Sequence, residues 1–318
     1  MNEVSIIIPH FGDSRPTLSL VDSILAGERE STKVEVIVVD DHSPEPLPAL
    51  PKPCRVIRRP ENGGFGAAVN TGLKVASCEV ALVLNSDLTI SRDFVRAFVH
   101  DAQRFGRAVV SPHVVNGQGR SQWAGRHRPT VGRQAVEWLA LPGPIRRTRW
   151  WHEAVGHDTR CTAGAIRPVD WVMGACMAIP VEPVRKIGGF DEQFFMNCEE
   201  VDLQRRLHEI GVPSIFLGTH TVIHRGGGSS ASDLRRQWLV TSRVRYSRKW
   251  GGHRELRLAL TVCTYLNFLF NNFSLICGRR VRPVDKFREE RALVSSGGTY
   301  AKAIEGVLRA EGERSWLP

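Results

Sequence analysis

The sequence predicts an α/β fold built on a mostly parallel β-sheet with helices on both faces. Apolar runs alternate with segments of helical spacing in the first third of the chain: strands are expected at 4–9, 34–39 and 79–84, and helices at 16–26, 65–76 and 91–104. Near-continuous runs of Val, Ile and Leu are typical of parallel strands buried on both faces. At 318 residues, the chain is long enough for one large α/β domain, or for one domain with an appendage.

Shorter elements complete this pattern. Segment 116–168 is rich in Gly, Pro, Arg and Trp and has weak periodicity, so we expect a long excursion from the sheet there. The other expected elements are strands at 54–58, 107–111 and 214–217, and helices at 180–187, from 199 onward and at 231–250. Regular structure is also expected at 169–179, and a further segment at 221–224. The sequence therefore predicts a main domain over 1–230 and a helical extension over 231–318.

The net charge of +10 is unevenly distributed. Segment 116–168 holds nine Arg and three acidic residues, and 231–257 holds eight Lys or Arg and two acidic residues. Basic surfaces attract nucleic acid, anionic lipid or phosphorylated ligands. Zinc-finger spacing, an aromatic RNA-binding motif and an unbroken basic run are all missing from the sequence, so nucleic acid is not expected as a partner.

The cysteines and the N-terminus indicate a reducing compartment. The seven cysteines are odd in number and scattered, and no two have CxxC spacing, which favours neither a disulfide framework nor a structural zinc site. The first residues enter a strand-like run at once, without the basic and apolar regions of a secretory signal. We expect a cytoplasmic protein.

Residues 258–278 contain no charged side chain and are long enough to span a membrane. Several polar side chains recur there at three- and four-residue spacing and form one helical stripe: Thr261, Thr264, Asn267, Asn271 and Ser274. Asparagines in mid-span are costly in hydrocarbon, so a helix lying at the membrane interface fits better than a spanning one. A buried C-terminal helix or a homodimer contact is an equally open interpretation.

Polar residues follow the second and fourth expected strands. Asp40 and Asp41 end one strand, and Asn85, Ser86 and Asp87 follow another. In sheets of this kind ligands bind beyond the carboxyl ends of the strands. A carboxylate there can accept hydrogen bonds from a nucleotide or hold Mg²⁺ or Mn²⁺. The alternative is an ordinary acidic turn or helix N-cap.

Two glycine-rich segments could approach a ligand closely. Asn62-Gly63-Gly64 opens a helix that carries Asn70, and helix amides attract phosphate or ribose oxygens. His224 and Arg225 precede three glycines, a combination that suits a metal and a pyrophosphate. The alternatives are a capped turn in the first case and a structural histidine in the second.

The stretch FFMNCEEVDLQRRL at 194–207 sets Glu199, Glu200 and Asp202 at the start of an expected helix. A helix start tolerates acidic groups because its unpaired amides carry partial positive charge. A carboxylate held there is placed to accept a proton or to meet a cation. Taken alone, the cluster could equally reflect the first-turn preference of acidic residues.

Taken together and in order, these segments resemble the family-2 glycosyltransferases with the GT-A fold, whose sheet is Rossmann-like. Within that family the likeness is to bacterial rhamnosyltransferase-like members that extend lipid-linked cell-surface glycans. The resemblance covers about 4–230 and rests on the motifs VVVDDHS, NGGFGAAVNTGL, LNSD, VDWVMGACMAI, GGFDEQFFMNCEEVDLQRRL and IHRGGGS. It implies a GT-A catalytic domain over 1–230, with 116–168 on the acceptor side.

The resemblance also implies roles for single residues. Glu200 takes the place of the catalytic base, with Glu199 beside it, and Asp87 and His224 take the places of the metal contacts. The pocket for the sugar and the acceptor is implied at Trp171, Gly174, Ala175 and Asp202. The residues implied to bind the donor, with Asp41 on the base, are Pro9, His10, Phe11, Asp40, Asp41, Asn62, Gly63, Gly64, Asn70, Asn85, Ser86, Asp87 and Arg225.

The sequence departs from the family pattern at two positions. Asn85 occupies the first position of the D-x-D element, and Glu200 replaces the usual aspartate base, which leaves Glu199 and Asp202 as substitutes. The resemblance implies an inverting glycosyltransferase that uses Mg²⁺ or Mn²⁺, a UDP- or dTDP-sugar donor and a glycan or polyprenyl-diphosphate-linked acceptor. It would act peripherally at an anionic membrane surface, on the inner face of the cell membrane. A catalytically silent nucleotide-sugar-binding or scaffold subunit is the alternative.

Overall fold

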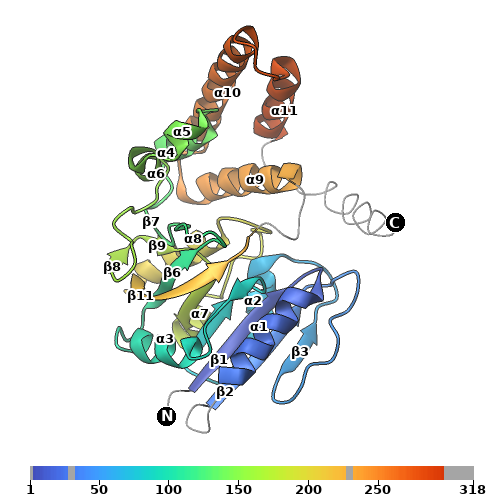
Figure 1. The fold of residues 1–318 in the computed structure, drawn as a ribbon, viewed down its shortest axis with the longest axis vertical. Helices are drawn as coiled ribbons and strands as arrows, with labels where there is room; N and C mark the ends of the chain where they lie inside the picture. The colour runs from blue at the N-terminus through green and yellow to red at the C-terminus, as the bar shows by residue number, and fades with distance from the viewer. Residues whose placement is uncertain (1–2, 28–32, 227–231, 297–318) are drawn as a thin grey trace. The chain divides into compact units, whose positions relative to one another are not determined.

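A computed structural model describes residues 3–27, 33–226 and 232–296 of the chain. Contacts divide the chain into two compact units (Figure 1), Met1–Arg128 with Gly156–Ser230, and Pro129–Val155 with Ala231–Pro318. Segment 129–155, which we expected within the excursion from the main domain, packs with the C-terminal helices in the second unit.

The first unit is built on one mixed sheet. In the described residues its strand order is β3-β2-β1-β4-β10-β6-β11-β5, with β8 paired to β11. The strands are β1 (Glu3–His10), β2 (Lys33–Asp40), β3 (Arg55–Arg58), β4 (Val80–Leu84), β5 (Leu88–Thr89), β6 (Val109–Val115), β8 (Ile166–Val169), β10 (Cys176–Pro180) and β11 (Ser214–His224). A second small sheet pairs β7 (Gly125–Arg126) with β9 (Trp171–Val172).

The predicted parallel arrangement holds from β3 through β4 and again between β6 and β11. Strand β10 runs antiparallel to both of its neighbours and joins these two parallel parts. The expected strand at 214–217 and the segment at 221–224 form one strand, β11, with an irregularity between Leu217 and Thr221.

Helices cover both faces of this sheet, as the buried strand pattern predicts. Because strand side chains alternate, Ile6 and Ile8 face α1 (Ser14–Gly27) and α3 (Phe94–Gln103), whereas Ile7 faces the other side. The helices on that second face are α2 (Phe65–Val75), α7 (Val181–Lys186) and α8 (Glu199–Glu209). The two apolar layers hold the carboxyl ends of β1, β2 and β4 at one edge of the sheet.

The second unit is helical. It contains α4 (Val131–Trp138), α5 (Gly143–Arg146), α6 (Arg149–Ala154), α9 (Ser232–Trp250), α10 (His253–Ile276) and α11 (Pro283–Ser296). Its core joins α4, α9, α10 and α11 through Trp138, Val240, Val244, Leu256 and Leu260. By length and composition alone, α10 is the one helix in the described part of the chain that could cross a membrane, and a third of that window is buried within the protein.

Candidate functional site

The candidate site lies at the carboxyl ends of three neighbouring strands. Strand β1 pairs in parallel with β2, so that His10 lies opposite Asp40, and on its other side with β4. The segments that leave these strands begin at Phe11, Asp41 and Asn85, and they therefore start side by side at one edge of the sheet. This is the arrangement expected for strand-end polar residues in an α/β sheet.

Asp40 anchors the loop that follows β2. Its buried carboxylate accepts hydrogen bonds from the Ser43 amide at 2.8 Å and from Arg58 Nη1 at 2.5 Å. Burial alone would raise the pKa of Asp40, but the bonds from Ser43 and Arg58 bring it below its ordinary value. The structure thus uses Asp40 to close the 41–47 loop instead of exposing it to a ligand.

Asp41 ties the same loop to the glycine turn before α2. Its carboxylate accepts from the amides of Gly63 at 3.1 Å and Gly64 at 2.7 Å, and from Arg59 Nη1 at 2.5 Å. Burial raises the pKa of Asp41, and these bonds oppose that rise. Only 4% of Asp41 is exposed, so a nucleotide base would have to displace Arg59 to reach it. The base-binding role of Asp41 stays a prediction.

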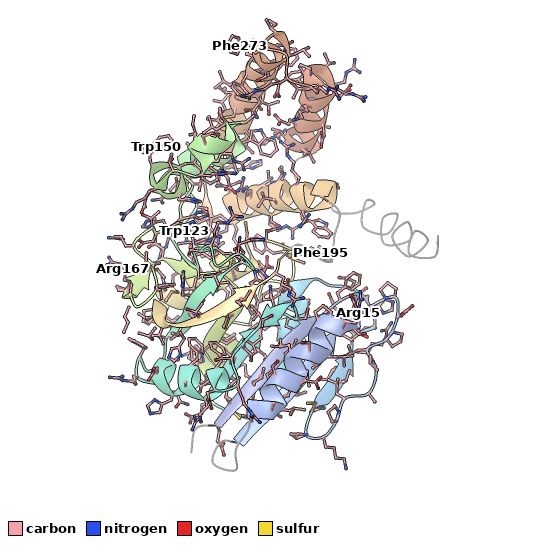
Figure 2. All side chains as sticks on the ribbon, viewed as in Figure 1. Arg15, Trp123, Trp150, Arg167, Phe195 and Phe273 are labelled. Carbon is pink, nitrogen blue, oxygen red and sulfur yellow. The ribbon has the colours of Figure 1, made fainter. Side chains whose placement is uncertain are left out.

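The two glycines of this turn are required by close packing. A Cβ at Gly63 would lie 2.5 Å from Arg59 Nη1, and a Cβ at Gly64 would lie 1.9 Å from the carbonyl oxygen of Phe195 (labelled in Figure 2). Gly64 also has a φ of +84°, which L side chains rarely adopt. The side chain of Asn62 accepts from the Gly64 amide at 3.1 Å and completes the turn.

Three residues expected to bind donor or acceptor are instead used by the fold. His10 is buried and its Nδ1 contacts Thr17 Oγ1 at 2.7 Å, which fixes the start of α1. Asn70 donates to the Phe190 carbonyl at 2.9 Å and accepts from its amide at 2.8 Å, which holds the turn before α8. Asp202 is fully buried and pairs with Arg206 Nε at 2.8 Å. Through these contacts the three side chains help to position the site from within the protein, although the buried Nε2 of His10 has no hydrogen-bond partner among the described residues.

The end of β11 brings His224 to the segment after β4. His224 Nε2 lies 3.2 Å from Asp87 Oδ1 and 3.2 Å from Asn85 Nδ2, and the Gly226 amide donates to Asp87 Oδ2 at 2.8 Å. Burial would raise the pKa of Asp87, but His224 and the Gly226 amide hold it below its ordinary value. Asp87 and His224, 137 positions apart in the sequence, therefore belong to one polar cluster.

The residues of this cluster can hold a divalent cation whose remaining ligands come from a substrate. Asp87 supplies a carboxylate oxygen and His224 an imidazole nitrogen, both of which are ligands for Mn²⁺ or Mg²⁺. Across the described residues no three His, Cys, Asp or Glu side chains gather as a complete metal cage. Mg²⁺ is commonly held by one or two carboxylates together with substrate phosphates, so two protein ligands suit a site that binds a diphosphate.

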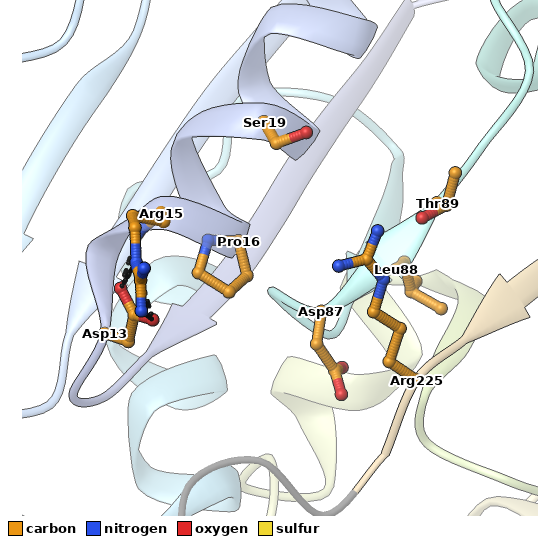
Figure 3. Close-up of a pocket in the computed structure, with 8 residues that line it drawn as sticks. All are labelled: Asp13, Arg15, Pro16, Ser19, Asp87, Leu88, Thr89 and Arg225. Carbon is orange, nitrogen blue, oxygen red and sulfur yellow. Dashed lines mark hydrogen bonds and ion pairs between the residues drawn. The ribbon is translucent and has the colours of Figure 1, made fainter. Parts of the chain in front are cut away.

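A cavity of about 360 Å³ lies beside this cluster (Figure 3). Figure 3 shows Arg225 extending along β5 and the Asp13–Arg15 ion pair on the opposite wall. In the described part of the chain, the guanidinium of Arg225 has no hydrogen-bond partner. The other lining residues are Pro16, Ser19, Asp87, Leu88 and Thr89. A cation without a partner next to Asp87 suits an anionic group of a ligand.

Segment 171–175 connects this cluster to the start of α8. The Ala175 carbonyl accepts from the Asn85 amide at 2.8 Å. A Cβ at Gly174 would lie 3.4 Å from the Phe65 ring and 3.6 Å from Glu200 Cβ, so Gly174 lies directly beside Glu200. Trp171 donates from Nε1 to the His127 carbonyl at 2.9 Å. Gly174 thus lies beside Glu200, and the next residue, Ala175, is hydrogen-bonded to Asn85 at the end of β4.

The buried Glu199 and the half-buried Glu200 form an acidic pair at the N-terminus of α8. Burial and the neighbouring Glu200 raise the pKa of Glu199 well above its ordinary value. Burial also raises the pKa of Glu200, but the charge of Arg126 and the Gly174 amide oppose that rise. Like charges this close cannot both ionise easily. The pKa of Glu199 has no opposing contribution from Arg126 or the Gly174 amide, so Glu200 is the member of the pair whose ionised form is better supported.

The backbone before this pair is strained. Asn197 and Cys198, the latter at the N-cap of α8, have φ values of 69° and 67°. Non-glycine residues cost about 1–2 kcal/mol each in this left-handed region. Strain of this kind is common where a fold holds a functional side chain in a fixed direction, and here it directly precedes Glu199 and Glu200.

Glu199→Gln is expected to raise stability increasingly with pH. A group whose pKa is raised by folding stabilises the protein below its unfolded pKa, about 4.3 for glutamate, and this stability is lost as pH rises through the folded pKa. Glutamine imitates the neutral form, so its advantage in unfolding free energy should grow from pH 5 to pH 8, to on the order of 1 kcal/mol. Urea unfolding at several pH values measures it. Glu209→Gln, at the exposed end of the same helix, is the control, and an equal effect from both variants would contradict the burial of Glu199.

Two residues of the weakly periodic 116–168 segment, Gln122 and Arg126, enter the site without any signal in the sequence. Gln122 contacts His224 Nδ1 at 2.8 Å. Arg126 lies 5.3 Å from the Trp171 ring centroid and donates to the carbonyls of Trp123 and Gln122. His224 lies 102 positions from Gln122 and Trp171 lies 45 positions from Arg126, so no spacing pattern could have identified these two contacts. By contrast, Pro9, Phe11 and Ser86 lie at the expected strand ends.

Comparisons with known proteins agree with this geometry. The family model described as Glycosyl transferase family 2 matches residues 5–174. The chain is 27% identical to the N-acetylglucosaminyl-diphospho-decaprenol L-rhamnosyltransferase of Mycobacterium tuberculosis (strain ATCC 25618 / H37Rv), over 66% of this chain and 71% of that protein. It is 23% identical to the rhamnosyltransferase WbbL of Escherichia coli (strain K12), over 58% of this chain and 69% of that protein.

A solved structure supports the fold. The crystal structure of GalNAc-T7 with UDP, GalNAc and Mn²⁺ matches with a TM-score of 0.56 and 15% identity over 100% of this chain. This chain spans 59% of that one. At this identity the likeness concerns the fold alone, and it confirms the predicted GT-A fold. Since the family model covers more than half of the chain and includes the ends of β1, β2 and β4, the chain belongs to glycosyl transferase family 2.

Proposed function

We propose that this glycosyltransferase moves a sugar such as rhamnose from a UDP- or dTDP-sugar to a hydroxyl of a glycan or lipid-linked acceptor, with inversion at the anomeric carbon. The observation that carries the proposal is the arrangement around 171–175. Gly174 lies beside the candidate base Glu200, and Ala175 is hydrogen-bonded to the strand end that carries Asp87. Segment 171–175 thus lies between Glu200, which would take the acceptor proton, and Asp87, which would help to hold the donor diphosphate.

The proposed reaction is a single displacement. Glu200 takes the proton of the acceptor hydroxyl, and that oxygen forms a bond to the anomeric carbon while the bond from this carbon to the diphosphate oxygen breaks. The electron pair of the broken bond stays on the diphosphate, which gains negative charge. Attack from the face opposite the leaving group inverts the anomeric configuration. Glu199 remains protonated and limits the negative charge next to Glu200.

Asp87 and His224 would hold Mg²⁺ or Mn²⁺, whose chemistry there is to neutralise the charge on the leaving diphosphate. Arg225 is suited to the same anion because its guanidinium has no other partner in the described residues. The similar Mycobacterium protein is named for a diphospho-decaprenol substrate, and GalNAc-T7 was solved with UDP and Mn²⁺. These names support a nucleotide-sugar donor, a polyprenyl-diphosphate acceptor and a divalent cation as proposals for this chain.

A thermal-shift panel of UDP- and dTDP-sugars, with and without Mn²⁺, tests the donor class. Ligands that bind only the folded state raise the melting temperature, so one nucleotide series should raise it more strongly in the presence of Mn²⁺. Release of nucleoside diphosphate is then assayed with the donor that binds. Cation-dependent binding without any release would favour the alternative, a catalytically silent nucleotide-sugar-binding subunit.

We further propose that the helical unit docks on an anionic membrane at the inner face of the cell membrane. Helix α10 buries its polar side within the helical unit and turns its apolar side outward, the reverse of the usual arrangement in a surface helix of a soluble domain. Four residues of its polar stripe, Thr264, Asn267, Asn271 and Ser274, are buried, whereas Thr261 is exposed. Asn267 donates to the Trp138 carbonyl at 3.0 Å and accepts from the Ala140 amide at 2.7 Å. Its outward face is apolar, with Leu269 64% and Phe273 63% exposed (Phe273 is labelled in Figure 2).

This outward face forms one stripe with arginines at both ends. Large apolar side chains recur at helical spacing over an arc of about 100°, at Leu258, Val262, Tyr265, Leu266, Leu269, Phe273 and Ile276. Exposed arginines flank the stripe at Arg254 and Arg257 and at Arg279, Arg280 and Arg282. A second copy of this face would bring like charges together, whereas anionic headgroups complement them.

Two substitutions in the stripe, Leu269→Glu and Phe273→Glu, are expected to reduce binding to anionic vesicles at least tenfold, because each places a charge where the apolar face would insert. Liposome flotation measures the loss, and Leu293→Glu on α11, a partly buried position of the helical core, controls for misfolding.

High salt should also release the wild type, since each nearby basic residue contributes about 1 kcal/mol that salt screens. Retention after alkaline carbonate would indicate a spanning helix, and a stable dimer without vesicle binding would indicate a protein contact; either result contradicts the proposal.

A further inference from the structure

Both ring nitrogens of His224 contact a side chain, so its hydrogen-bonding roles can be worked out. Nδ1 lies 2.8 Å from Gln122 Oε1, and Nε2 lies 3.2 Å from both Asn85 Nδ2 and Asp87 Oδ1. A neutral imidazole carries one hydrogen and one lone pair. Which nitrogen carries the hydrogen decides whether Nε2 is available to a cation.

The orientation of Gln122 answers this question. Its Nε2 donates to the backbone carbonyl of His224 at 2.7 Å. Because a carbonyl oxygen only accepts, the amide nitrogen of Gln122 must face it, and the amide oxygen must face His224 Nδ1. That oxygen also only accepts, so the hydrogen is on Nδ1. Nε2 is left facing the Asn85 amide and the Asp87 carboxylate, each at 3.2 Å. A hydrogen on Nε2 donates to Asp87, and a lone pair there accepts from Asn85 and can bind a cation that takes the place of that hydrogen.

Gln122 is itself held in place by a tight turn at the end of β6. Its amide donates to the Val114 carbonyl at 2.9 Å, and its carbonyl accepts from Arg126 Nη2 at 3.2 Å. Strand β6 runs parallel to β11, with Val115 opposite Ile223, so the turn after β6 emerges directly beside His224. The backbone therefore delivers the Gln122 side chain to His224 in one orientation.

We propose that Gln122 is a positioning residue that holds the His224 ring with Nε2 facing Asp87, so that the two side chains form a preorganised pair for a divalent cation. The proposal rests on the metal role given to Asp87 and His224 in the proposed function. A metal-binding histidine commonly donates its second N–H to a carbonyl or carboxylate, which fixes both its tautomer and its ring direction. Here Gln122 bonds to the ring and to the backbone carbonyl of His224, and these two bonds fix the hydrogen on Nδ1 and the direction of the ring.

Mn²⁺ affinity in the presence of UDP or dTDP, whichever raises the melting temperature more with Mn²⁺, tests this without any turnover, since no sugar is present. Free Mn²⁺ is followed by electron paramagnetic resonance in the wild type, Gln122→Leu and Gln122→Glu. Loss of such a partner typically weakens metal binding 10- to 100-fold, and this is the expected effect of Gln122→Leu. Gln122→Glu keeps an acceptor for Nδ1–H but cannot donate to the His224 carbonyl, so it should lose less. Gln118→Leu, exposed in the same turn, should bind as the wild type does.

A double-mutant comparison separates positioning from general damage. In the His224→Ala background, Gln122→Leu should weaken Mn²⁺ binding no further, because its only route to the cation runs through His224. Long-range ¹H–¹⁵N correlation spectra give a second readout. The His224 resonances, identified by their absence in His224→Ala, should show the Nδ1–H tautomer in the wild type and a shift away from it in Gln122→Leu.

The outcomes distinguish this proposal from the proposed function. A wild type that binds Mn²⁺ with neither UDP nor dTDP overturns the metal role of Asp87 and His224, and this proposal with it. A wild type that binds Mn²⁺, together with unchanged affinity in folded Gln122→Leu and Gln122→Glu, overturns the role of Gln122 alone. The Nε2–H tautomer in the wild type also overturns it. If Gln122→Leu does not fold, Gln122→Glu and the tautomer measurement decide.

Discussion

Glu200→Gln is expected to lower the turnover number by about two to four orders of magnitude, the usual contribution of a positioned general base. Glutamine keeps the shape of the side chain but cannot accept the acceptor proton. Donor affinity should barely change, because the donor diphosphate is assigned to Asp87, His224 and Arg225. Steady-state kinetics together with donor binding by calorimetry measures both quantities.

Glu199→Gln is the matched control for this substitution. The two residues are adjacent, but burial and the neighbouring Glu200 raise the pKa of Glu199 well above its ordinary value, so a neutral amide there should leave turnover within a few-fold of the wild type. If Glu199→Gln abolished turnover and Glu200→Gln did not, the base would be Glu199 and the assignment would be wrong by one residue.

Asp87→Ala is expected to abolish transfer and to remove donor-dependent Mn²⁺ binding while the protein stays folded. The side chain of Asp87 is 26% exposed and lies at a strand end, so its loss opens no cavity in the apolar core. Loss of the carboxylate also leaves His224 Nε2 without its partner. Activity and Mn²⁺ binding are measured on the same sample, with circular dichroism to verify folding.

Asp101→Ala provides the control for loss of an aspartate–histidine contact. Asp101 on α3 contacts His220 at 2.8 Å and has a similarly exposed side chain, but it takes no part in the candidate site. Its loss should leave Mn²⁺ binding unchanged. Full turnover by Asp87→Ala in metal-free buffer would contradict the role given to Asp87.

The fold was largely predictable because the patterns that indicate its strands and helices lie within short segments of the sequence. Runs such as VSIIIP and VEVIVV predict buried parallel strands, and β1 and β2 confirm them in that role. The direction of β10 was not predictable, since an apolar run reads the same whether it pairs in parallel or antiparallel. Likewise, the packing of 129–155 with the C-terminal helices depends on contacts such as that between Trp138 Nε1 and Thr264, at 2.9 Å, which no local pattern encodes.

The candidate site was predictable in place but only partly in role. Strand-end position correctly brought Asp40, Asp41, Asn85 and Asp87 to one edge of the sheet. It could not tell which carboxylates the fold itself uses, because the partners are distant in sequence: Arg58 for Asp40, for example, and Arg59 with two glycine amides for Asp41.

The polar stripe of 258–278 illustrates the same limit. Its helical spacing was evident, but the side that it faces was not. The inward hydrogen bonds of Asn267 to Trp138 and Glu290 turn the stripe toward the protein and leave the apolar side outward. Periodicity gives the angle between two faces of a helix, and only tertiary contacts decide which face is buried.

The most direct test of the account is release of nucleoside diphosphate from UDP- and dTDP-sugars by the purified protein, with a bacterial lipid extract as the source of acceptor. The account predicts release from at least one donor that depends on Mg²⁺ or Mn²⁺, is lost in Asp87→Ala and is strongly reduced in Glu200→Gln. Donor binding without release under any of these conditions, or release that is unchanged in both variants, would contradict it.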